Sequence, residues 1–371
     1  MNCSLVEHFS TLSDPRIERK KLHQLMDIIV LTVCATLSGA QGWEAIEEFG
    51  HNKLDWLRQF VPLKNGIPSH DCIAYVISRL SPKEFQGCFM DWVGAIREVV
   101  PNEVIAVDGK TARRSHDRKR HKNPLHMVSA WGCANRLVLG QEATEEKSNE
   151  ITAIPKLLAL LELHGCIVTI DAMGCQRAIA EQIVEQGGDY CLGLKGNQGD
   201  LYEATEDFFT TARQADFKNV TYDYHEEIDN DHGRLEIRRY WITEELCTLP
   251  KTQLWKGLKS IGWVERECRE GDKVTVEQRC FINSIVADGK LFAHAVRSHW
   301  GIENRLHWRL DVVFREDDNR IRKGNAAAIM TTIRHICMNL FQEEPSKLSM
   351  KKKMNKAAWN DSYRAKLLLG Q

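Results

Sequence analysis

Hydrophobic residues in the first hundred positions recur at helical spacing. The apolar run at 20–37 predicts a buried helix. Ser69 and Ser81 each precede a helix-forming segment and are expected to be N-caps, and Ser13-Asp-Pro-Arg16 offers a further helix start. Residues 1–98 are therefore expected to form a helical N-terminal domain.

The pattern changes at Val104, where short apolar runs bounded by turn residues replace the helical spacing. Strands are predicted at 104–108, 126–131, 136–140, 166–170 and 189–194, and helices at 150–164 and 176–186. Three strands, a helix, a strand, a helix and a strand is the order of an RNase H-like mixed sheet, whose parallel part obeys the right-handed crossover rule. The fold class is thus expected to be α/β, with a second domain over residues 99–345.

Beyond the fifth strand, alternating segments at 234–241 and 273–282 predict a β-rich insertion over about residues 201–288. Helical spacing then returns over 290–311 and predicts a late helix. The final segment, 346–371, begins with several lysines and is expected to form an exposed basic tail.

Two of the predicted strands end in an aspartate, Asp108 in the first and Asp171 in the fourth. An ionised carboxylate at the end of a buried strand is costly unless a cation compensates it, so the repetition suggests that both acids converge on a divalent metal. Neighbouring strands would bring them side by side, and Glu303 on the late helix would be the third acid. We predict that the three acids are the metal ligands and catalytic residues of a phosphoryl-transfer site with two ions, Mg²⁺ or Mn²⁺.

His299, Glu303 and His307 are spaced so that they would share one face of an α-helix. Zinc hydrolases use such spacing, but the sequence signals no further nitrogen or sulfur ligand nearby. The two histidines are instead expected to line nucleic acid or to support Glu303, and a plain packing role is an equal alternative. Trp300 and Trp308 are expected to belong to the core.

Basic residues follow the first strand closely, with six Lys or Arg against one Asp in 113–122. Such a run is usually a solvated loop, but beside an acidic metal site it would be well placed to bind phosphates. Lys195-Gly-Asn-Gln198, at the end of the fifth strand, is interpreted as either a phosphate-binding loop or a simple turn. The candidate DNA-binding residues are Lys110, Arg113, Arg114, Lys195, Asn197, His299, Arg305, His307 and Arg309.

Composition excludes several classes of protein. The 371 residues are 43% hydrophobic with a net charge of −1, which is ordinary for a globular chain and argues against a protein that is basic throughout. Twelve cysteines form no CxxC pair, which argues against a zinc ribbon or a disulfide framework. The apolar run at 25–37 contains Asp27 and is too short to span a bilayer. A cytoplasmic protein with reduced thiols and no membrane partner is expected.

Five motifs in order, together with Gly66-Ile-Pro-Ser-His-Asp71, resemble the DDE transposases of bacterial insertion sequences, most closely the H repeat-associated group. The resemblance covers nearly the whole chain. The motifs are Ala106-Val-Asp-Gly-Lys-Thr111, Thr169-Ile-Asp-Ala-Met-Gly-Cys-Gln176, Leu194-Lys-Gly-Asn-Gln198, Asp231-His-Gly-Arg234 and His299-Trp-Gly-Ile-Glu-Asn304.

The resemblance implies an RNase H-like core, two magnesium or manganese ions and cut-and-paste-type DNA chemistry. Its acids fall on Asp108, Asp171 and Glu303. The implied partners are double-stranded DNA, namely the terminal inverted repeats of the element and its target, and a second copy of the chain. The helical N-terminal domain is then expected to bind DNA or mediate assembly, with a structural cap as the alternative.

Related transposases carry a Tyr, Arg, Glu and Lys signature around the last acid. Here Val296, His299 and Leu310 occupy the Tyr, Arg and Lys positions, and Arg297, His307 and Arg309 are the candidate substitutes. Two further hypotheses stay open on the sequence. The chain could be a catalytically silent, DNA-binding remnant of a transposase, or an RNase H-like nuclease without strand transfer.

Overall fold

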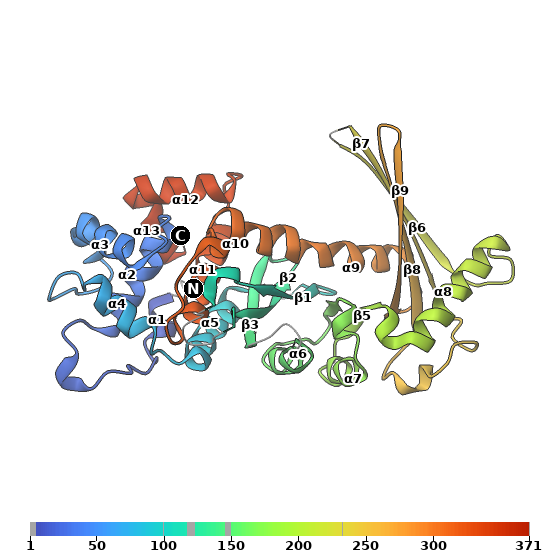
Figure 1. Ribbon diagram of the computed structural model, residues 1–371, viewed down its shortest axis with the longest axis horizontal. Coiled ribbons are helices and arrows are strands. Elements are labelled where there is room, and N and C mark those ends of the chain that lie inside the picture. Colours follow the sequence, from blue (N-terminus) through green and yellow to red (C-terminus); the bar gives the residue numbers. More distant parts are fainter. Residues whose placement is uncertain (1–4, 99, 117–122, 145–149, 232, 371) are drawn as a thin grey trace.

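The chain has a mixed α/β fold built on one nine-stranded sheet, as seen in a computed structural model (Figure 1). The structure describes residues 5–98, 100–116, 123–144, 150–231 and 233–370. Its strands are β1 (Val104–Thr111), β2 (His126–Gly132), β3 (Leu137–Thr144), β4 (Ile167–Ile170), β5 (Asp189–Leu194), β6 (Asp223–Asp231), β7 (Arg234–Thr243), β8 (Ser260–Glu270) and β9 (Lys273–Asn283). They lie in the order β3-β2-β1-β4-β5-β9-β8-β7-β6, and only the β1–β4 and β4–β5 pairs are parallel.

The N-terminal segment is helical, as predicted, with two of its helices capped by the expected serines. Its α-helices are α1 (Leu5–Phe9), α2 (Leu25–Leu37), α3 (Trp43–Leu57), α4 (His70–Ile77) and α5 (Pro82–Ile96). The Ser69 and Ser81 side chains accept hydrogen bonds from the first turns of α4 and α5. The helix start expected at Ser13–Arg16 is wrong, because Asp14 binds the Arg16 guanidinium at 2.8 Å instead of capping a helix.

The five predicted strands of the central sheet are present, and two helices cover one of its faces. These are α6 (Glu150–Leu158), which ends six residues earlier than expected, and α7 (Arg177–Glu185). The other face is crossed by the long helix α9 (Gly289–Gly301), which contacts β1, β4 and β5 (Figure 1). The sheet is therefore enclosed between helices, which explains why β2, β4 and the first half of β1 consist of buried residues.

The insertion after β5 begins with a helix that the sequence did not predict, α8 (Gly199–Gln214), and continues as strands β6 to β9. We call these four strands the arm, because their far ends project beyond the body of the molecule (Figure 1). The last residues of β9 pair with β5, so the arm extends the central sheet. Gly262 on β8 lets the Phe292 ring of α9 pack against the strand, where any Cβ would collide with the ring.

The C-terminal segment is not the exposed tail that its lysines suggested. After α11 (Ala326–Glu343), the chain forms α12 (Met350–Trp359) and α13 (Asp361–Leu369). Lys353 is buried and donates hydrogen bonds to the carbonyl groups of Phe341 and Glu344. The Arg364 side chain, also buried, lies 4.0 Å from the Trp56 ring of α3, so this end of the chain packs on the N-terminal helices.

None of the described helices combines the length and the apolar character needed to cross a membrane.

Candidate active site

Asp108 and Asp171 lie at the same level of two adjacent parallel strands. Val107 of β1 is in register with Ile170 of β4, and each is followed by one of the aspartates. Asp171 leaves its strand at once, and its carboxylate accepts a hydrogen bond from the Met173 amide at 3.0 Å. β1, in contrast, continues to Thr111, so Asp108 is an internal strand residue rather than the terminal one predicted. The expected convergence of the two acids therefore follows from the strand pairing.

The surroundings of Asp108 disfavour its charge. Burial raises the pKa of this carboxyl to about 7, the backbone amide of Gly109 opposes the rise, and the nearby charges of Asp171, Glu303 and Glu150 add to it. A group that ordinarily ionises near pH 4 is thus half protonated at neutral pH. The rise shows that Glu303 belongs to the same electrostatic neighbourhood as the two aspartates.

Glu303 lies on an irregular stretch of helix and faces solvent. α9 is followed by one π-helical segment, Ile302–His307, and then by α10 (Trp308–Val312). Such segments interrupt α-helical spacing, so the face predicted for His299, Glu303 and His307 is not that of a regular α-helix. Over the described residues, no three His, Cys, Asp or Glu side chains are close enough together to hold a metal ion. The three acids share a neighbourhood without forming a closed cage.

The two histidines contact the strands that carry the aspartates. His299 Nδ1 lies 3.0 Å from Thr169 Oγ1 on β4, and His307 Nδ1 lies 3.5 Å from Asp108 Oδ2. Burial lowers the pKa of His299 to about 4 and that of His307 to about 3, so both imidazoles are neutral at pH 7. Neutral rings held in this way support the packing of the helix on the sheet and add no positive charge for binding phosphate.

Lys110, a candidate DNA contact, forms ion pairs with three acids of its own chain. Its side chain is only 11% exposed, and its Nζ lies 2.7 Å from Asp311, 3.3 Å from Asp317 and 3.5 Å from Glu316. These acids belong to α10 and to the following turn, Glu316–Asp318. Lys110, two residues after Asp108 in the chain, therefore links β1 to the segment that follows Glu303.

The other basic candidates are partly paired. Arg113 and Arg114 contact Asp317 and Asp318 at 3.2 and 3.6 Å, yet their side chains are 81% and 51% exposed. The rest of that basic run, 117–122, lies outside the described residues. At the other candidates, Lys195 and Arg305 are exposed, Asn197 donates to the Ala172 carbonyl at 2.7 Å, and Arg309 donates to Gln342 at 3.0 Å.

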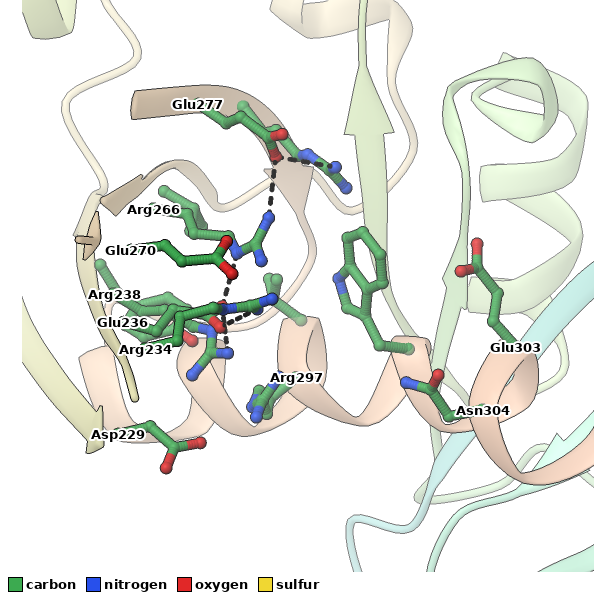
Figure 2. Close-up of a pocket in the computed structure, with 15 residues that line it drawn as sticks. Asp229, Arg234, Glu236, Arg238, Arg266, Glu270, Glu277, Arg297, Glu303 and Asn304 are labelled. Carbon is green, nitrogen blue, oxygen red and sulfur yellow. Dashed lines mark hydrogen bonds and ion pairs between the residues drawn. The ribbon is translucent and has the colours of Figure 1, made fainter. Parts of the chain in front are cut away.

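Two cavities meet at Glu303. The first, of about 600 Å³, lies between the arm and α9, and we call it the arm cleft (Figure 2). The second, of about 530 Å³, opens at the ends of β4 and β5 beside Asp171 and Lys195, and we call it the strand-end cavity. Both are lined by Glu303 and by Trp300, whose ring lies 4.5 Å from the Arg279 guanidinium. Trp300 is thus half-buried at the cavities rather than in the core, and the expected core position of Trp308 is also wrong because that ring is exposed.

Several residues around the site were missed from the sequence. The arm cleft has five arginines in its wall, Arg234, Arg238, Arg266, Arg279 and Arg297. Glu236 is hydrogen-bonded to three of them, which holds its pKa at about 2 despite burial. Near Asp108, His126 binds the buried Glu150 carboxylate at 2.6 Å, and together they leave no room for a Cβ at Gly109. Glu150 stands at the start of a predicted helix, and nothing in the sequence indicated that it would lie near Asp108.

The residues present fit a divalent cation in chemical type and in electrostatics. Carboxylate oxygens are the ligands that Mg²⁺ and Mn²⁺ prefer. The raised pKa of Asp108 arises from burial and from neighbouring negative charge, and a cation at this place would offset both effects. Asp108 and Asp171 would hold it, and Glu303 would complete the set if its carboxylate approached them.

Comparison with known proteins shows the family of the chain. The family description "Transposase DDE domain" matches residues 101–340, and "DDE_Tnp_1-associated" matches residues 6–93. "H repeat-associated putative transposase YhhI" of Escherichia coli (strain K12) is 44% identical over 99% of this chain and 98% of its own length. "Putative transposase YncI" of Escherichia coli O157:H7 is 42% identical over 97% of this chain and 93% of its own.

Among solved structures, a piggyBac transposase synaptic complex with hairpin DNA matches with a TM-score of 0.42 and 10% identity, over 97% of this chain and 76% of that one. A likeness this weak carries no argument about function. The family match and the curated relatives are sufficient by themselves: the chain belongs to the DDE transposase family.

Proposed function

We propose that this protein is a DNA transposase whose catalytic and metal-holding residues are Asp108, Asp171 and Glu303. The observation that carries the proposal is the pairing of β1 with β4, which sets the two aspartates side by side, with the charge of Glu303 acting on Asp108. Membership of the DDE transposase family supports it further. The substrates would be double-stranded DNA at the inverted repeats of the element and at the target.

The reaction proposed is in-line phosphoryl transfer in two stages. In nicking, water attacks a phosphate at the element end, and the bond to the departing 3′-oxygen breaks as the new phosphorus–oxygen bond forms. In strand transfer, the freed 3′-hydroxyl attacks target DNA in the same way. Asp108, Asp171 and Glu303 would hold divalent ions, which DDE transposases generally use, and these would supply charge stabilisation at the attacking and leaving oxygens. We propose two such ions, Mg²⁺ or Mn²⁺.

The protein's own groups have distinct tasks in this scheme. Asp108 lies within β1 and Asp171 directly follows β4, whereas Glu303 would reach the site from an irregular helical segment. Lys110 and His307 connect that segment to β1 and thus keep the third acid near the other two. Arg113, Arg114 and Lys195 are exposed around the acids and are proposed to contact DNA phosphates.

We infer a domain arrangement to accompany this function. Strands β1 to β5 with α6 and α7 would form an RNase H-like catalytic core within residues 99–345, and the arm would be its β-rich insertion. Residues 1–98 would form the DNA-binding or assembly domain. A homodimer on DNA is proposed, because both ends of an element must be held together.

The experiment is a nicking assay with the full chain, DNA carrying the terminal repeats of its element, and Mn²⁺ or Mg²⁺. Asp108→Asn, Asp171→Asn and Glu303→Gln should each abolish nicking. Asp207→Asn, which alters an exposed acid on α8, is the matched control and should leave the rate unchanged. Nicking that persists in the Asp108 variant would refute the assignment.

The product of the assay separates the remaining possibilities. A joined target strand identifies a transposase, and cleaved ends that never join identify a nuclease. Binding without cleavage in any divalent ion identifies a silent remnant.

A further inference from the structure

The two long edges of the arm differ in how they are protected. β5 pairs only with residues 280–283 of β9, so the outer side of 273–279 has no neighbouring strand among the described residues. All seven of these residues are exposed, including Val274 at 56% and Val276 at 54%. An open, partly apolar strand edge presents free backbone donors and acceptors to any chain that can pair with it.

The sequence of this edge is complementary to itself. In an antiparallel pairing about a two-fold axis at Thr275, Lys273 of one copy lies opposite Glu277 of the other. Val274 lies opposite Val276, and Thr275 meets its own copy. Each of these cross-strand pairs is favourable, and the charged and apolar pairs each occur twice by symmetry.

Neighbouring registers lack this match. Two residues that lie opposite each other in an antiparallel pair must both point their backbone N–H and C=O groups toward the partner strand or both away from it. The two-fold axis between two copies of one strand must therefore pass through a residue, and the register can shift only by moving the axis from one residue to another. With the axis at Val276, Lys273 would lie opposite Arg279, which places like charges together. The charges therefore favour the register centred on Thr275 over the one centred on Val276.

The opposite edge of the arm is guarded against such pairing. β6 contains five acids in nine residues, so most registers of two copies would place acids opposite one another. Its apolar residue Ile228, 65% exposed, lies in the same cross-strand row of the sheet as Val276. The arm thus has one edge that repels a copy of itself and one that matches it.

We propose that the outer edge of β9, residues 273–277, is a self-association surface through which two copies of this chain join their arms into one continuous antiparallel sheet. The partner is a second copy because residues 273–277 complement their own sequence in charge, size and register. This inference does not depend on the proposed chemistry, since it concerns assembly alone.

The test is a charge exchange read out by sedimentation velocity on the full chain without DNA over a wide concentration range. The wild-type chain should dimerise reversibly. Lys273→Glu should weaken the dimer at least about tenfold, because it places like charges opposite one another twice. Glu277→Lys should do the same, and it also removes the contacts of Glu277 with Arg266 and Arg279 of its own chain. The double variant K273E/E277K restores opposite charges and should return the dissociation constant to within about threefold of the wild-type value.

A matched pair of substitutions, each of an apolar residue by Glu, tests which edge of the arm forms the dimer. Val276→Glu on β9 should weaken the dimer, and Ile228→Glu in the same row on β6 should not. Circular dichroism melts identify any variant that has lost its fold, and rescue by the double exchange cannot come from misfolding. A wild-type chain that stays monomeric, a dimer indifferent to the single exchanges, or a double variant that stays as weak as the singles would overturn the proposal.

Discussion

The buried cluster around Lys110 gives a prediction about both stability and activity. Replacing Lys110 by Met keeps much of the side-chain volume and removes the charge. Three carboxylates, on Asp311, Glu316 and Asp317, then lose their shared partner at distances of 2.7 to 3.5 Å. Burial alone would lower the pKa of Lys110, yet these acids raise it above its usual value, so the charged form is the stable one in the folded chain.

The size of the effect follows from how many partners remain. Removing one member of a buried ion pair typically costs about 3–5 kcal/mol, because the remaining charge is left buried and uncompensated. Glu316 keeps Arg334 at 3.0 Å and the Thr331 hydroxyl at 3.0 Å, which moderates the loss. We therefore expect Lys110→Met to lower the free energy of unfolding by about 3 kcal/mol. Lys110→Arg keeps the charge and should recover part of this stability.

The assay is urea denaturation followed by tryptophan fluorescence, with a surface lysine as the control. Lys251 pairs with Asp200 where both side chains are largely exposed, so Lys251→Met should cost less than about 1 kcal/mol. Because Lys110 fastens β1 to the segment after Glu303, its Met variant should also nick DNA more slowly at temperatures where it remains folded. If the two Met variants lose equal stability, the cluster does not hold these elements together and the reasoning is refuted.

Three further outcomes are expected. The pKa of Asp108 is raised from 3.8 to about 7, so in EDTA the wild-type chain should lose up to roughly 4 kcal/mol of stability relative to Asp108→Asn as pH rises between these values, and Mn²⁺ should reduce this difference at pH 8. Gly262→Ala should cost about 1–3 kcal/mol in urea denaturation because its Cβ collides with Phe292, and Phe292→Leu should offset part of the loss. Arg364→Ala should lower the melting temperature and speed hydrogen exchange in α3, since the guanidinium stacks on Trp56.

The central sheet could be predicted because its signals are local. Strands at 104–108 and 166–170 are continuous apolar runs, and parallel pairing of such runs aligns the residues that follow them. The nearness of Asp108 and Asp171 needed no further information. The bounds were less certain, because β1 extends past Asp108 by pairing with β2 as far as Thr111, which the alternation of residues did not reveal.

The parts that could not be predicted depend on distant contacts. Lys110 looked like a phosphate ligand because its acidic partners lie some two hundred residues away in the chain. The lysines after position 346 looked exposed because nothing nearby shows that Lys353 reaches the end of α11. Helical spacing around Glu303 assumed a regular helix, whereas the π-helical segment changes the direction in which its residues point.

The distribution of charge decides which basic residues remain able to bind DNA. Lys110 cannot exchange its partners for phosphate without leaving the buried Glu316 and the partly buried Asp311 and Asp317 with less compensation, so it serves the fold. Arg113 and Arg114 also face acids, but these pairs are exposed, and exposed ion pairs contribute little and are screened by salt. A phosphate can replace Asp317 or Asp318 at small cost. Among the described basic residues that follow β1, Arg113 and Arg114 are therefore the ones that we propose contact DNA, and their pairs with Asp317 and Asp318 would hold their side chains near the acids until it binds.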